Sequence, residues 1–68
     1  MANMKITFQK DRDTFVLEGT KAEERDGDLF LDGKLVGWYN IPDCGWFVAG
    51  LVPGRPKDIT YWTRAVIS

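Results

Sequence analysis

The chain has 68 residues, too few for a second hydrophobic core, so we expect a single domain spanning residues 1–68. Hydrophobic residues make up 44% of the sequence and charged residues 28%, a globular composition that argues against disorder. The net charge of −1 argues against a nucleic-acid-binding protein, because proteins of that class are usually basic.

The N-terminal part has the period of β-strands. In residues 5–9, Ile6 and Phe8 alternate with polar residues and would share one face of a strand. After a charged hairpin loop, residues 14–25 read as a long strand, in which Gly19 marks a bulge or a bend. The first two strands are therefore expected to pair as a hairpin.

Two Asp-Gly pairs, Asp26-Gly27 and Asp32-Gly33, divide the middle of the chain. Asp-Gly between alternating segments is a strong hairpin signal, because a type I′ turn needs a positive φ at both central residues. The strands on either side of these turns are expected to form a three-stranded meander of residues 20–25, 28–31 and 34–40.

In the C-terminal part, the segment "IPDCG" predicts a turn in which Gly45 takes the left-handed conformation, and residues 46–52 form the next strand. Residues 59–67 are rich in β-branched and aromatic side chains and favour a strand. The alternative is a short helix at 58–67, capped by Asp58. We therefore predict an all-β fold: a small antiparallel meander or partly open barrel, SH3-like or OB-like, of five or six strands. The alternative fold is α+β with the short C-terminal helix.

Aromatic residues come as neighbours at Trp38-Tyr39, Trp46-Phe47 and Tyr61-Trp62. Adjacent side chains of a strand point to opposite faces of the sheet, so each pair sends one ring to each side. A domain of this size has one core. Up to three rings are therefore expected on the face opposite the core, and we assign Phe47 and Tyr61 to it.

The turn at Asp32-Gly33 sets the predicted register of the meander. It pairs Leu31 with Lys34, Phe30 with Leu35, and Leu29 with Val36. One face would then be core and carry Ala22, Leu29, Leu31, Val36 and Trp38. The other would carry Phe30, Leu35 and Tyr39, with Lys21, Glu23 and Arg25 around them. This second face is either covered by the C-terminal segment of the same chain or left as an apolar patch for a partner.

The candidate partner-binding residues are therefore Phe30, Leu35, Tyr39, Phe47 and Tyr61. Candidate electrostatic contacts are Glu23, Glu24, Asp26, Asp28, Arg55, Lys57 and Arg64. The acidic segment 18–32 would meet a basic surface on a partner that handles nucleic acid.

The sequence shows no equipment for catalysis, for a cofactor or for a metal. It contains no histidine, the commonest general base, and its single cysteine, Cys44, excludes an internal disulfide and a multi-cysteine zinc site. The segment "DGDLFLD" lacks the ligand spacing of a calcium loop, and "PGRPKD" lacks that of a phosphate loop. A short chain without disulfides indicates the reducing cytoplasm, and no run of residues has the length or apolarity of a signal or membrane-spanning segment.

These features predict a non-enzymatic protein-binding module that acts as an inhibitor, modulator or adaptor of a larger protein. Its length is typical of bacteriophage and mobile-element accessory proteins. One alternative is a single-stranded nucleic-acid-binding domain, in which Trp46 or Phe47, Tyr61 and Trp62 stack on bases and Arg55, Lys57 and Arg64 contact phosphates. The other is a homo-oligomeric structural subunit. Neither a cofactor nor a membrane is expected as a partner.

Overall fold

A computed structural model describes residues 3–55 and 57–68. These residues form eight strands and one short 3-10 turn, which confirms the all-β prediction. The elements are β1 (Met4–Lys10), β2 (Asp13–Gly19), β3 (Ala22–Arg25), β4 (Asp28–Leu31), β5 (Lys34–Asn40), η1 (Ile41–Asp43), β6 (Gly45–Ala49), β7 (Ile59–Trp62) and β8 (Arg64–Ile67). The alternative helix at 58–67 is wrong, because that segment contains β7 and β8.

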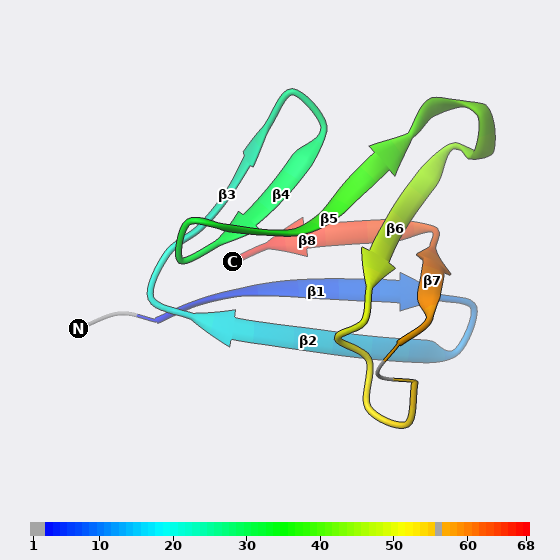
Figure 1. Ribbon diagram of the computed structural model, residues 1–68, viewed down its shortest axis with the longest axis horizontal. Coiled ribbons are helices and arrows are strands. Elements are labelled where there is room, and N and C mark those ends of the chain that lie inside the picture. The colour runs from blue at the N-terminus through cyan, green and yellow to red at the C-terminus, as the bar shows by residue number, and fades with distance from the viewer. Residues whose placement is uncertain (1–2, 56) are drawn as a thin grey trace.

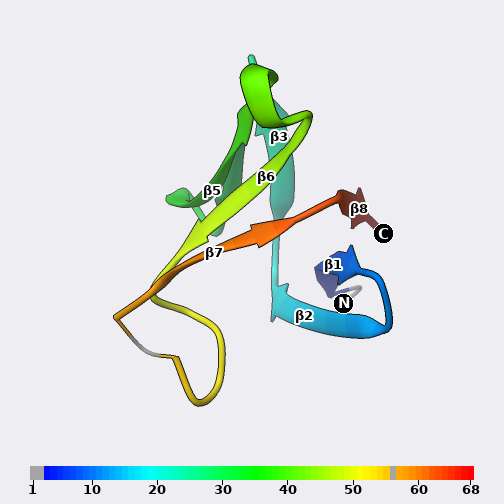
Figure 2. The same cartoon turned by 90° about the vertical axis from the view of Figure 1, so that its right-hand side faces the viewer.

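The strands form two antiparallel sheets, one in the order β2-β1-β8 and one in the order β3-β4-β5-β6-β7. In Figure 1, β3 and β4 lie above the three-stranded sheet, whereas β6 and the loop that follows it cross in front of it, and Figure 2 shows the two sheets from the side. The chain passes between them twice, from β2 into β3 and from β7 into β8. Joined across these two corners, the eight strands make six extended segments, and their pairing within the described residues does not close into a barrel.

The corner between β2 and β3 is fixed by Asp32. Its Oδ1 accepts hydrogen bonds from the backbone N–H groups of Thr20 and Lys21, at 2.9 and 2.8 Å. Its own N–H donates to the Lys21 carbonyl at 2.8 Å. β2 ends at Gly19, where the chain turns towards the second sheet, and a Cβ there would displace the side chains of Asp32 and Leu31, with Asp32 Oδ2 only 2.7 Å away. The predicted bend at Gly19 is therefore confirmed.

The core lies between the two sheets. It consists of Ile6, Phe8, Ala22, Leu29, Val36, Val48 and Trp62. Phe8, Phe15 and Trp62 form an aromatic cluster whose ring centroids are 5.9–6.3 Å apart. The indole Nε1 of Trp62 donates to the Thr60 hydroxyl at 2.8 Å, so this buried polar group is satisfied. Ile6 and Phe8 share the core face of β1, as their alternation predicts.

The meander forms as predicted, with one change of register. Asp26, Gly27, Asp32 and Gly33 all have positive φ, as type I′ turns require. The pairs Leu31–Lys34 and Phe30–Leu35 agree with the prediction.

The predicted pairing of Leu29 with Val36 is wrong. A β-bulge intervenes, and Leu29 pairs with Gly37 instead. Val36 is the extra residue of β5, and it is buried in the core. Because one added residue reverses the facing of every later side chain in the strand, Trp38 and Tyr39 exchange faces relative to the prediction.

The turn between β5 and β6 also differs from the prediction. Ile41–Asp43 form the 3-10 turn, and Cys44 rather than Gly45 takes the left-handed conformation, with φ of 51°. Gly45 begins β6, and a Cβ on it would overlap the ring of Tyr61. Glycine at this position therefore makes room for a ring from the neighbouring strand.

The two faces of the meander predict different losses of stability for the same substitution. Leu29 is 2% exposed and Leu35, on the adjacent strand, is 55% exposed. Leu29→Ala should reduce the free energy of unfolding by about 2–5 kcal/mol, and Leu35→Ala by no more than about 0.5 kcal/mol. Urea denaturation of both variants measures the difference. Equal losses would show that the assignment of faces is wrong.

Candidate protein-binding face

The side of the five-stranded sheet that is turned away from the core is here called the outer face. Cross-strand pairing places Trp38 opposite Phe47, and Phe47 opposite Tyr61. Their rings form a row across β5, β6 and β7, with centroids 6.0 and 5.7 Å apart. The apolar members of the outer face are Phe30, Leu35, Trp38, Phe47, Ile59 and Tyr61.

Two cations hold the outermost rings of this face. The guanidinium carbon of Arg25 lies 4.3 Å from the ring centroid of Phe30, and Lys10 Nζ lies 5.5 Å from that of Tyr61. The Tyr61 hydroxyl also donates to the backbone carbonyl of Asp43 at 2.7 Å. These contacts fix the rings before any partner arrives, which lowers the entropy lost on binding.

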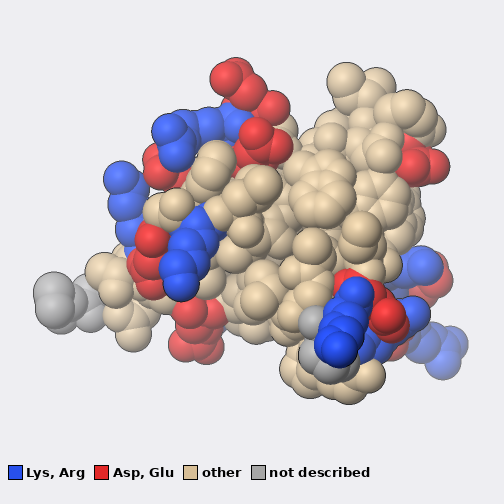
Figure 3. Space-filling view, viewed as in Figure 1, with Lys and Arg blue, Asp and Glu red and all other residues tan. Residues whose placement is uncertain are grey.

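The apolar part of the outer face is accessible to solvent. Leu35 and Ile59 are 55% and 62% exposed, and the rings of Phe30, Trp38, Phe47 and Tyr61 are half-buried. Figure 3 shows uncharged side chains over β5 and β6, with charged side chains gathered at the margins of the view. An apolar centre that contains aromatic rings and has a polar rim is the composition of a protein interface.

The margin at β3 and β4 is acidic. Glu23 and Asp28 belong to the outer face, because they pair with Phe30 and Trp38 respectively. Arg25 lies 3.7 Å from Glu23 and neutralises part of this charge. Glu24 and Asp26 extend the acidic margin to the end of the hairpin, where Glu24 Oε2 accepts a hydrogen bond from the Gly27 N–H.

Four of the five predicted contact residues lie on the outer face: Phe30, Leu35, Phe47 and Tyr61. Tyr39 does not. It belongs to the row of Trp46 and Trp62 on the inner side, and its ring centroid lies 5.0 Å from that of Trp46, although its side chain is 39% exposed. Trp38 takes its place. A glycine within a strand often marks a β-bulge. Gly37 is therefore the feature of the sequence from which the bulge, and the change in facing of Trp38 and Tyr39, could have been predicted.

The cations and rings of the alternative nucleic-acid site are brought together only in part: Phe47 and Tyr61 are neighbours on the outer face, and Arg55 and Trp62 line one pocket. Trp62 is buried in the core and Trp46 packs against the core from the inner side, whereas Tyr61 is on the outer face. Arg64 lies on β8 in the other sheet. Arg55 and Lys57 are exposed in the loop before β7, where Arg55 pairs with Asp58.

The remaining chemistry of the described residues is sparse. Cys44 is an exposed free thiol whose Sγ contacts the Ile41 carbonyl at 3.5 Å. Across residues 3–55 and 57–68, no three Cys, Asp or Glu side chains are placed to hold a metal ion. The same part of the chain contains no helix of the length and apolarity needed to cross a bilayer.

Comparison of the chain with protein-family models, with curated proteins and with solved structures finds no match. The outer face is a preformed apolar surface with charged margins, and such a surface is suited to contact with another molecule.

Trp38 and Trp62 face opposite sides of the sheet, so the same substitution should destabilise the protein to different extents. Trp62→Ala should reduce the free energy of unfolding by about 3–5 kcal/mol, because the indole is 7% exposed and packs on Phe8 and Phe15. Trp38→Ala should cost less than half as much, because that ring lies on the outer face. Urea denaturation followed by circular dichroism compares them. A larger loss of unfolding free energy for Trp38→Ala would show that the Trp38 ring is in the core and that its assignment to the outer face is wrong.

Proposed function

We propose that this protein is a non-enzymatic binding module whose outer face docks on a larger protein, which it inhibits, modulates or links to another component. The observation that carries the proposal is the row of Trp38, Phe47 and Tyr61, flanked by the exposed Leu35 and Ile59. Rigid aromatic anchors surrounded by aliphatic side chains are the usual energetic centre of an interface.

The size of the molecule supports docking by a whole face. Its dimensions are 34 × 28 × 22 Å, and Figure 3 looks down the shortest of these axes. A stable interface buries about 800 Å² on each partner, which for so small a protein requires most of one face. The five-stranded sheet supplies such a surface.

The charge of the margin indicates the chemistry of the partner. The β3–β4 hairpin carries Glu23, Glu24, Asp26 and Asp28 against the single Arg25. An apolar patch bordered by Lys and Arg complements this arrangement, and attraction between the two margins would speed association at low salt. A basic surface of this kind is typical of proteins that handle nucleic acid. The length of the chain is typical of bacteriophage accessory proteins, and a cytoplasmic location is part of the same proposal.

Site-specific photo-crosslinking in native cells tests the proposal. A benzoylphenylalanine in place of Leu35, which flanks the aromatic row of the outer face, should yield one product with a larger protein. The same group in place of Val66, which is 40% exposed on the three-stranded sheet, should yield none. Ile59→Lys should abolish the Leu35 product, because a buried unpaired charge is costly, whereas Val66→Lys should leave it unchanged. Mass spectrometry of the product identifies the partner peptide.

Other outcomes would overturn the proposal in recognisable ways. A product of twice the mass of the chain would make the outer face a contact between two copies. A nuclease-sensitive product would make it a nucleic-acid surface. Equal products from the Leu35 and Val66 positions, or none from Leu35, would show that this face does not dock. Urea denaturation confirms beforehand that the Ile59→Lys and Val66→Lys variants are folded.

A further inference from the structure

A pocket that shares no residue with the outer face lies between β2 and the loop before β7. The cavity has a volume of about 360 Å³, within the range of pockets that bind small ligands or peptide side chains. It is lined by Asp13, Thr14 and Phe15 of β2, by Val52, Pro53 and Arg55 of the loop, and by Trp62. The pocket therefore joins β2 to the loop and β7, which are distant from β2 in the sequence.

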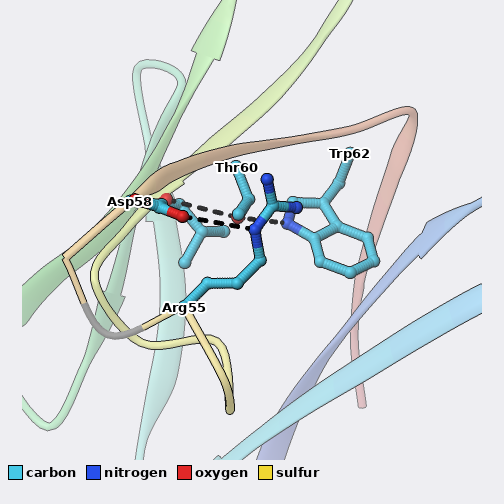
Figure 4. A network of polar contacts seen from close by, with 5 residues as sticks. Arg55, Asp58, Thr60 and Trp62 are labelled. Atoms are coloured by element: carbon cyan, nitrogen blue, oxygen red, sulfur yellow. Dashed lines mark hydrogen bonds and ion pairs between the residues drawn. The ribbon is translucent and has the colours of Figure 1, made fainter.

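The floor of the pocket is aromatic and fixed. The rings of Phe15 and Trp62 are stacked, with centroids 5.9 Å apart. The Trp62 indole is held by its hydrogen bond to Thr60, whose hydroxyl in turn donates to the Val48 carbonyl at 3.4 Å. Figure 4 shows this chain of contacts beside Arg55. An apolar side chain placed here would meet a rigid surface rather than one that must first be ordered.

A cation stands at the mouth of the pocket. Arg55 Nε lies 3.4 Å from Asp58 Oδ2, and the two side chains are 62% and 58% exposed. The terminal Nη groups of Arg55 have no hydrogen-bond partner among the described residues. The loop is held by backbone bonds from Arg55 to Val52 and from Gly50 to Asp58, both at 2.9 Å. The free Nη pair can therefore grip a carboxylate through two parallel hydrogen bonds.

The third component is the edge of a sheet. β2 is the end strand of the order β2-β1-β8, so one side of its backbone has no strand partner within the described chain. The residues at its start, Asp13 to Phe15, also line the pocket. An extended peptide that adds to such an edge makes backbone hydrogen bonds with the strand and places alternate side chains into adjoining pockets.

We propose that the pocket and the edge of β2 bind the extended C-terminal segment of a partner protein. The last side chain, a large aliphatic or aromatic one, would rest on Phe15 and Trp62. Its carboxylate would pair with Arg55, and the preceding backbone would extend along β2. A C-terminal residue suits the site because it supplies an apolar group and a carboxylate from the same carbon atom.

This second surface extends the proposed protein-binding function, but it does not share residues with the outer face. The two proposals can therefore fail separately. Loss of peptide binding would leave the Leu35 crosslink intact, and absence of that crosslink would leave peptide binding at β2 intact.

Nuclear magnetic resonance titration with a defined probe tests the inference. The probe is the peptide acetyl-Thr-Val-Thr-Val-Leu with a free C-terminal carboxylate, and its C-terminal amide is the matched control. The free acid should shift the amide resonances of residues 13–17, Val52, Gly54 and Arg55, and the indole resonance of Trp62. The amide should bind about tenfold more weakly, because it cannot form the charge-assisted pair with Arg55.

Two variants separate the role of Arg55 from general charge. Arg55→Ala should weaken binding of the free acid about tenfold and remove its advantage over the amide, whereas Arg64→Ala on β8 should change neither. Equal affinities of acid and amide for the unaltered protein would overturn the role of the carboxylate. Shifts confined to residues of the outer face, or no shifts at millimolar peptide, would overturn the site itself. The amide arm needs no variant, so its result stands even if Arg55→Ala disturbs the loop.

Discussion

The structure depends on one close approach between two strands. At Gly37, a Cβ would lie 2.8 Å from the backbone carbonyl oxygen of Phe47, so β5 and β6 can take this geometry only with glycine there. The bulge at this point lets Val36 reach the core, and it sends Trp38 to the opposite side. A single extra residue thus decides which rings stabilise the fold and which remain available for contact.

The two aromatic rows have different roles: the inner row packs towards the core, and the outer row lies on the surface. On the inner side, Tyr39, Trp46 and Trp62 form a row across β5, β6 and β7, and Trp62 packs on Phe8 and Phe15 in the core. A chain of this size has a small core, and these rings supply much of its apolar area. On the outer side, no strand of the described chain packs over the second row, whose rings are half-buried. The C-terminal segment does not fold over it, because β7 belongs to the same sheet and β8 pairs with β1.

The local features of the fold could be predicted from the sequence because their causes are local. Both Asp-Gly turns, the three-stranded meander and the core face of β1 follow from turn chemistry and strand alternation. The bulge and the conformation of the "IPDCG" turn could not be fixed in this way. Gly37 and Gly45 are required by atoms of other strands, the Phe47 carbonyl and the Tyr61 ring, so their roles appear only once the strands are paired. The wrong prediction of which way Trp38 and Tyr39 face has the same origin.

The carboxylate of Asp32 connects the turn between β4 and β5 to the segment in which the chain crosses from β2 to β3. It sits in the tight turn between β4 and β5, and it also binds the backbone of residues 20 and 21, where the chain crosses from one sheet to the other. The angle between the sheets is therefore tied to the integrity of that turn. A hinge motion at Gly19 would have to break the contacts of Asp32, so the domain should respond to load as one rigid unit rather than as two hinged leaves.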